Sequence, residues 1–231
     1  MNKSYVSAQE SNLKLIVKVA FGIIFQVPLL FIPAGTFEWP EAWLFLFLFT
    51  CYALGATFYL KKHNPELLGR RTSYKLPEKG WDKLFLLSTT ILFVVTYIIM
   101  PLDAVRYKWS SVPLSFKATG FIGVTLSLIA IFWVLKENAY LFRTVTVQEG
   151  QKVVTTGPYK YLRHPMYASF ILMLVCIPLA LGSYYALIPS FVINLLLITR
   201  TYLEDKELHR ELPGYNEYAK KTKYKLIPGV W

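Results

Sequence analysis

The chain has 231 residues, of which 55% are hydrophobic and 16% aromatic, and its mean hydropathy is +0.39. This composition leaves too little polar surface for a water-soluble globule, so lipid is the expected solvent. The formal net charge of +11 does not indicate nucleic-acid binding, because the basic residues lie in the segments between apolar runs rather than on one face.

Four nearly uncharged runs are long enough to cross a hydrocarbon core about 30 Å thick. They comprise residues 19–37, 43–60, 84–102 and 118–135. The first run has no small-residue cleavage site and is closely followed by the second, so we expect a retained helix rather than a cleaved signal peptide.

The connection between the second and third spans is polar and basic. Residues 65–68 are predicted to form a short turn at the membrane interface. Residues 80–83 are predicted to anchor the start of the third span through Trp81, because tryptophan prefers the headgroup level.

Basic residues are concentrated in alternate connections. The stretch 61–83 carries seven of them: Lys61, Lys62, Arg70, Arg71, Lys75, Lys79 and Lys83. The opposite connections carry only Arg106, Lys108 and Lys117, while the turn at 37–41 has two glutamates and no base. By the positive-inside rule, the N-terminus, the loop 63–83, the segment 137–165 and the C-terminus are predicted to face the cytosol.

Residues 166–202 form a fifth apolar stretch that is too long for one crossing. Gly182 and Ser183 permit a tight turn, which divides it into arms of residues 166–181 and 184–202, each under about 30 Å as a helix. Pro178 and Pro189 are expected to kink these arms. The stretch is therefore predicted to be a helical hairpin with both ends on one side of the membrane.

Polar and turn-forming residues precede this hairpin. Residues 145–154 alternate apolar and polar side chains, which favours a short extended segment. Residues 155–167 contain two prolines, a glycine and three tyrosines, so they are predicted to form a shaped loop and not a regular helix. The hairpin should bring the loop 157–167, the stretch 200–207 and the segment 151–154 together around one pocket.

Arg200 and Glu204 lie four residues apart, on one face of the expected helix. They could be an interfacial ion pair that ends a span. Ionisable groups near the hydrocarbon boundary are costly, however, and tend to mark function. The arginine offers a fixed fork to a carboxylate or phosphate, and the glutamate could meet a cation, an amine or a ribose hydroxyl.

The residues and motifs that disulfides, metal sites and several common enzyme classes require are missing from the sequence. Cys51 and Cys176 fall inside apolar runs, so neither a disulfide framework nor a thiolate metal site is expected, and the three histidines show no metal-ligand spacing. The sequence also has no Walker loop, GxGxxG turn or GxSxG elbow, which disfavours kinase, soluble dinucleotide-binding and α/β-hydrolase functions.

The second half carries an ordered set of motifs: Gly-Pro-Tyr-Lys-Tyr-Leu-Arg-His-Pro-Met-Tyr at 157–167, Pro-Leu-Ala-Leu-Gly-Ser at 178–183, Arg200, Glu204-Asp205, and Leu-Pro-Gly-Tyr-Asn-Glu-Tyr at 212–218. In this order they resemble the isoprenylcysteine carboxyl methyltransferase family over roughly residues 145–231. The loop 65–83 is similar to prokaryotic members. Many members have two adjacent glutamates where this chain has Glu204-Asp205, so the resemblance gives Asp205 no role.

The resemblance implies S-adenosylmethionine as cofactor, with Arg200 and Glu204 as catalytic residues. Arg200 would contact the substrate's carboxylate, and Glu204 would also bind the cofactor. The remaining cofactor-binding residues implied by the family are Gln151, Lys152, Val153, Val154, Tyr159, His164, Pro165, Met166 and Tyr167. A methyl group transferred from a sulfonium to an ionised carboxylate needs alignment and exclusion of water, but no metal and no general base.

The predicted fold class is all-α: a polytopic transmembrane bundle of four spans plus a C-terminal helical hairpin, with a cytosolic cofactor pocket. Residues 1–136 would form the spans and the basic loop, and residues 137–231 the cofactor-binding catalytic half. The lysine-rich tail at 220–225 would face headgroups or fold back as a lid. The membrane would be the cytoplasmic membrane of a prokaryote or the endoplasmic reticulum of a eukaryote.

The expected partner is a lipid or lipidated acceptor held in the bilayer, with no nucleic acid. Two alternatives remain open. An amine-directed phospholipid methyltransferase would need a base beside the acceptor, for which Glu204 or His164 would have to serve. A membrane reductase would use a similar pocket for NADPH, whose phosphate would call for arginines such as Arg143, Arg163 and Arg200.

Overall fold

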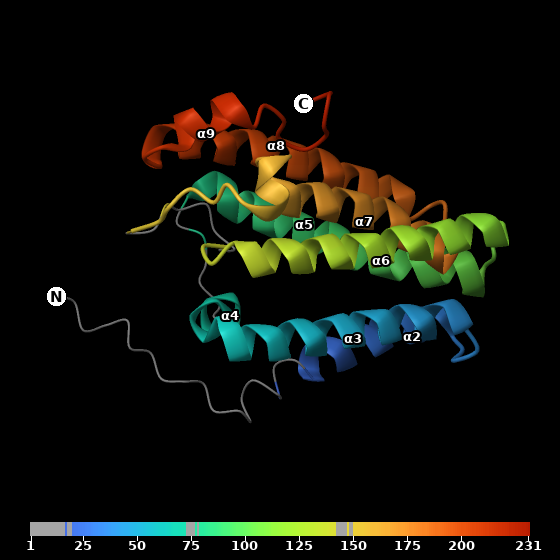
Figure 1. The fold of residues 1–231 in the computed structure, drawn as a ribbon. Coiled ribbons are helices and arrows are strands. Elements are labelled where there is room, and N and C mark those ends of the chain that lie inside the picture. The colour runs from blue at the N-terminus through green and yellow to red at the C-terminus, as the bar shows by residue number, and fades with distance from the viewer. Residues whose placement is uncertain (1–16, 18–19, 73–76, 78, 142–146, 148–149) are drawn as a thin grey trace.

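The computed structural model describes residues 17, 20–72, 77, 79–141, 147 and 150–231. In these ranges every regular element is a helix, and the long helices run roughly parallel in one bundle (Figure 1). In chain order the elements are α2 (Gln26–Ala34), α3 (Pro40–His63), α4 (Pro65–Thr72), α5 (Gly80–Pro101), the π-helix η1 (Leu102–Arg106), α6 (Leu114–Glu137), the 3-10 helix η2 (Gly157–Lys160), α7 (Pro165–Leu181), α8 (Leu187–Glu211) and α9 (Tyr215–Lys221).

Four helices are long and apolar enough to cross a membrane: Pro40–His63, Gly80–Arg106, Leu114–Glu137 and Leu187–Glu211. They correspond to three of the four predicted spans and to the second arm of the predicted hairpin. Side chains such as Phe47 and Ile122 point outward with about 60% of their surface exposed, as lipid-facing residues should. The all-helical membrane fold predicted from the sequence is confirmed.

The first predicted span, 19–37, differs from the prediction in the residues that the structure describes. It is helical over Ala20–Ala34, which is shorter than the spans above. Gly35 ends this helix in the left-handed conformation, with φ of 74°, so Phe37 lies outside it. Residue 19 lies outside the described residues.

The predicted hairpin is confirmed as α7 and α8, which pack against each other. Gly182, with φ of 86°, ends α7 and allows the chain to reverse. Pro178 lies inside α7, whereas Pro189 lies in the first turn of α8, where a helix tolerates proline, and not in its middle. Helix α8 continues to Glu211, beyond the predicted end at 202, so Arg200, Glu204 and Asp205 share one helix.

Helices α6 and α7 approach each other unusually closely. A Cβ on Gly120 would overlap the backbone of Ala180, and one on Gly123 would overlap the sulfur of Cys176. Small residues let helix backbones come together where lipid supplies no hydrophobic drive for association. Glycine is therefore required at both positions, and the α6–α7 pair forms a fixed wall beside α8.

The connections at the end of the bundle where α7 turns into α8 are tied together by polar contacts. Asp103 is fully buried there and accepts hydrogen bonds from the hydroxyls of Ser110 at 2.7 Å and Ser183 at 2.6 Å. Lys117 pairs with Glu41 at 2.6 Å across the same end. Helices α4 and α9 lie at the other end, where the described part of the loop between α6 and α7 also lies (Figure 1).

Residues 65–68, predicted to be a short turn, begin the helix α4. Asn64 caps this helix by accepting a hydrogen bond from the backbone amide of Leu67 at 3.0 Å, and Pro65 starts it. Residues 151–155 form no regular element. Residues 145, 146, 148 and 149 of the predicted extended segment lie outside the described residues.

Candidate cofactor pocket

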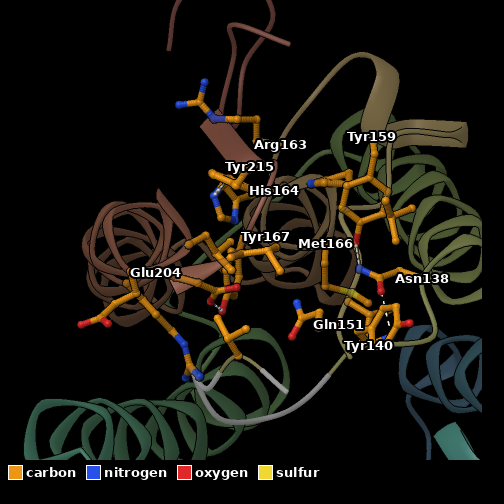
Figure 2. A pocket seen from close by; sticks show the side chains of 18 of the residues that line it. Asn138, Tyr140, Gln151, Tyr159, Arg163, His164, Met166, Tyr167, Glu204 and Tyr215 are labelled. Atoms are coloured by element: carbon orange, nitrogen blue, oxygen red, sulfur yellow. Dashed lines mark hydrogen bonds between the residues drawn. The ribbon is translucent and has the colours of Figure 1, made fainter. Parts of the chain in front are cut away.

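A cavity of about 700 Å³ lies at the loop end of the bundle. Its walls come from α5, α7, α8 and α9 and from the segment that joins α6 to α7, as Figure 2 shows from close by. The volume is within the range of about 300–1,000 Å³ that is typical of pockets for small molecules. All of the site residues predicted from the sequence line it: Gln151, Lys152, Val153, Val154, Tyr159, His164, Pro165, Met166, Tyr167, Arg200 and Glu204.

The loop before α7 is shaped by a glycine and two prolines. Gly157 has φ of 55°, and a Cβ there would overlap the side chain of Glu137. Pro158 lies in the single 3-10 turn, and Pro165 is the first residue of α7. These constraints hold Tyr159 and His164 at the cavity wall. The loop predicted for 155–167 is confirmed up to His164, whereas residues 165–167 begin α7, because Pro165 is well suited to a first helical position.

Tyr159 is fixed at both its phenol and its backbone. Its hydroxyl accepts a hydrogen bond from the side-chain amide of Asn138 at 2.7 Å, and its carbonyl accepts one from the hydroxyl of Tyr218 at 2.7 Å. Burial raises the pKa of Tyr159 above the ordinary value for tyrosine. The residue therefore offers the cavity a neutral aromatic ring in one fixed orientation.

Glu204 faces the cavity from α8 and is held by α7. The hydroxyl of Tyr167 donates to Oε2 of Glu204 at 2.5 Å. Met166 and Phe170, also on α7, add apolar wall beside this carboxylate. Glu207 and Glu211 also line the cavity from α8. Carboxylates beside aromatic and thioether groups suit a ligand that combines positive charge or hydroxyls with a planar ring.

Arg200 lines the cavity one turn before Glu204, but its ion-pair partner comes from α5. Its Nη2 lies 3.1 Å from Oδ1 of Asp82, and both side chains are more than nine-tenths buried. Its guanidinium also lies over the ring of Phe85, 4.4 Å from the ring centre. The simple Arg200–Glu204 pair considered from the sequence is thus replaced by Arg200–Asp82 and Glu204–Tyr167.

Asp205 is the centre of a buried cluster behind the cavity wall. Arg163 donates to both of its oxygens, from Nε at 2.9 Å and from Nη2 at 3.1 Å. Nε2 of His164 lies 3.1 Å from Oδ1, and the hydroxyl of Tyr215 donates to the same oxygen at 2.8 Å. Burial, and then the nearby carboxylate, raise the pKa of Tyr215, so the phenol remains a donor.

The C-terminal segment is docked onto this cluster. The backbone amides of Arg163 and His164 donate to the carbonyls of Tyr224 and Lys225 at 2.9 and 3.0 Å. Tyr215 and Tyr218 of α9 line the cavity. Of the two arrangements considered from the sequence, the segment folds back against the pocket, although Lys220, Lys221 and Lys223 remain exposed.

Several residues of the site were not predicted from the sequence. Asp82, which pairs with Arg200 but does not line the cavity, lies in the stretch 80–83 interpreted as a membrane anchor, and the wall residue Phe85 lies in the third predicted span. Asn138 and Tyr215 had no assigned role, and Arg163 was considered only for the phosphate of NADPH. A signal existed for Asp82, because an ionisable residue at the start of a span usually has a charged partner within the bundle. Within the described residues, no group of three or more His, Cys, Asp or Glu side chains could hold a metal ion.

Membrane-length helices with a ligand-sized cavity at the end of a helical hairpin define an integral membrane protein with a small-molecule site. The model of the isoprenylcysteine carboxyl methyltransferase (ICMT) family matches residues 115–210, so the chain is similar to that family over the region that contains the hairpin and much of the pocket.

Curated relatives match the chain over part of their length. The Bacillus subtilis protein YpbQ is 36% identical over 38% of this chain and 55% of its own length. The nickel-cobalt-cadmium resistance protein NccN of Alcaligenes xylosoxydans is 26% identical over 56% of this chain and 59% of its own. The cobalt-zinc-cadmium resistance protein CzcN of Cupriavidus metallidurans is 27% identical over 56% of this chain and 58% of its own. The chain thus spans little more than half of each relative.

Proposed function

We propose that this protein is an S-adenosylmethionine-dependent methyltransferase that acts on a lipidic acceptor from within the membrane. The observation that carries the proposal is one cavity shared by the Glu204 carboxylate, the aromatic wall of Tyr159 and Tyr167, and the buried guanidinium of Arg200. The match of residues 115–210 to the ICMT family supports the same reaction class.

The residues present fit this cofactor. Glu204 would hold the ribose hydroxyls or the amino group, because a carboxylate accepts hydrogen bonds from both. Tyr159 and Tyr167 would offer aromatic faces to the adenine ring and to the sulfonium. The segment 151–154 and His164 to Tyr167 would close around it, and the docked α9 would exclude water.

The most suitable acceptor is the carboxylate of an isoprenylcysteine-like molecule. The bound donor supplies an electrophilic methyl carbon, whose transfer forms a carbon–oxygen bond, breaks the carbon–sulfur bond and leaves a neutral ester. Arg200 would hold the acceptor carboxylate, which is already ionised near pH 7. The apolar walls from Phe93, Phe170 and Leu197 would receive its hydrocarbon chain. The basic residues of the stretch 61–83 support a cytosolic position for this pocket by the positive-inside rule.

The proposal is tested first by binding. S-Adenosylhomocysteine should raise the unfolding temperature of the detergent-purified protein, and NADPH should not, because only a ligand of the folded state stabilises it. Glu204→Gln should remove most of this stabilisation. Glu217→Gln is the matched control, since Glu217 is exposed on α9 and does not line the cavity. Stabilisation by NADPH alone would instead support a reductase.

The acceptor is tested with labelled S-adenosylmethionine. Wild-type protein should label N-acetyl-S-farnesylcysteine as a base-labile ester, and Arg200→Met should lose this activity while still binding S-adenosylhomocysteine. Base-stable label on phosphatidylethanolamine would show that the acceptor is an amine and not a carboxylate. No label on either lipid or on a total lipid extract would refute a methyltransferase.

A further inference from the structure

The start of α5 holds the Arg200 side chain at two points. Asp82 and Phe85 lie three residues apart and therefore on the same face of α5. Oδ1 of Asp82 lies 3.1 Å from Nη2 of Arg200, and the Phe85 ring lies 4.4 Å from the guanidinium carbon. One turn of α5 thus fixes both the edge and the face of a guanidinium that α8 carries into the cavity.

This pair is costly for stability alone. The side chains of Arg200 and Asp82 are only 7% and 2% exposed, and removing two charges from water usually costs as much as their attraction returns. Two apolar residues would join α5 to α8 at least as well. What the pair does is hold the planar guanidinium of Arg200, with its five N–H donors, in one orientation beside the pocket.

A second ion pair joins the same helices without this consequence. Lys79 pairs with Glu207 at 2.9 Å, and their side chains are 30% and 19% exposed. Each pair contributes one lining residue from α8, Glu207 and Arg200, while neither Lys79 nor Asp82 lines the cavity. The two pairs differ in burial and in shape: one is nearer to solvent, and the other is buried and holds a planar guanidinium at the cavity wall.

We propose that Asp82 is a positioning residue for methyl transfer, which acts by holding Arg200 in the orientation that receives the acceptor's anionic group. Asp82 also neutralises the positive charge of Arg200 until the anionic group of the acceptor binds. The inference rests on the proposed function. Asp82 and Phe85 lie outside residues 115–210, so the family match does not include them.

The test measures acceptor kinetics and cofactor binding separately. Asp82→Asn should reduce kcat/KM for N-acetyl-S-farnesylcysteine by about 100-fold, the loss that a displacement near 1 Å can cause. Its affinity for S-adenosylhomocysteine, measured by calorimetry, should change less than about threefold, within the usual context error of such contacts. Asp82→Glu retains the charge and should keep more activity than Asp82→Asn.

Two controls separate positioning from general destabilisation. Lys79→Gln breaks the neighbouring α5–α8 pair, and Asp103→Asn removes a buried carboxylate at the other end of the same helical segment; both should retain activity. In an Arg200→Met background, Asp82→Asn should cause no further loss of acceptor binding, because its effect passes through the missing guanidinium. An additional loss there would overturn the proposal.

The outcomes also distinguish this inference from the proposed function. If wild-type protein labels the acceptor but Asp82→Asn performs equally well, only the positioning role fails. The same holds if Asp82→Asn loses S-adenosylhomocysteine binding in proportion to its activity. If the wild type labels nothing, both proposals fail. Should Asp82→Asn not fold, Asp82→Glu decides: a raised KM with unchanged S-adenosylhomocysteine affinity supports positioning, and an unchanged KM overturns it.

Discussion

The two ends of the helix bundle bury carboxylates in opposite ways. Asp103, at the end where α7 turns into α8, accepts hydrogen bonds from Ser110, Ser183 and the backbone amide of Tyr185, all neutral donors. Asp205, at the pocket end, is paired with the ionised Arg163. Neutral hydrogen-bond donors are sufficient to hold the loops together at the Asp103 end. At the pocket end, the ion pair keeps a positive charge in a fixed position beside the cavity.

The packing of α6 against α7 differs from end to end as well. Near the Asp103 end, Gly120 brings the backbone of α6 against that of Ala180. At the pocket end the segment after α6 is instead held to η2, in the loop before α7, by the Asn138–Tyr159 hydrogen bond of 2.7 Å. One end is closed by contact of main chains, and the other is held by polar side chains around the cavity.

The largest effect should follow removal of charge at the pocket end. Asp205→Asn leaves the buried Arg163 without its carboxylate, which should cost about 3 kcal/mol or more. Asp103→Asn keeps an oxygen that the two serine hydroxyls can still donate to, so about 1 kcal/mol is expected. Both are measured by denaturant unfolding in detergent. Equal losses of unfolding free energy in the two variants would show that the charged and the neutral cluster do not differ in this way.

The next effect concerns the closed end. Gly120→Ala forces α6 away from the backbone of Ala180 and should cost about 1–3 kcal/mol through overpacking. Gly55→Ala is the matched control in another apolar helix, because nothing lies within 4 Å of its added Cβ. That change should be neutral or stabilise by at most about 1 kcal/mol. A thermal unfolding series in one detergent compares them, and similar results for both would contradict a close α6–α7 contact.

Much of this architecture could be predicted from the sequence. The spans and the hairpin follow from the length of the apolar runs and from Gly182, because a bilayer allows few alternatives. The pocket residues on α7 and α8 were also predicted, since a hairpin must bring its two ends together. The early end of the helix Ala20–Ala34 was missed, because one left-handed glycine, Gly35, stops a run whose hydropathy continues.

The partners of the charged residues could not be predicted in the same way. Arg200 and Asp82 are separated by more than a hundred positions, and their meeting depends on how α5 rotates against α8, which hydropathy does not specify. The role of Asp205 likewise depends on side chains that come from the loop before α7 and from α9, namely Arg163, His164 and Tyr215. Periodicity identifies the helices that meet, but not which polar side chains face one another.

The smallest effect is a pH dependence that Tyr218 should contribute at the pocket end. Burial raises the pKa of Tyr218 to about 12, while its hydroxyl donates to the carbonyl of Tyr159 at 2.7 Å. As pH rises, the unfolded state loses this proton first, near pH 10.0. The stabilisation from neutral Tyr218 is therefore complete below that pH and is lost as the pH approaches about 12.

Tyr218→Phe tests this directly. The variant should be less stable than wild type by about 1 kcal/mol at pH 8, because one hydrogen bond is missing. The Tyr159 carbonyl then keeps only the longer hydrogen bond from the hydroxyl of Thr222, at 3.3 Å. The difference in free energy of unfolding between wild type and variant should narrow above pH 10, since phenylalanine has no proton to release. The free energy of unfolding of both proteins should be measured from pH 8 to 11. As an internal control, it should change with pH in the same way for both proteins below pH 9. A constant gap would mean that Tyr218 is not neutral and buried, and the water-excluding role of α9 would then lose its support.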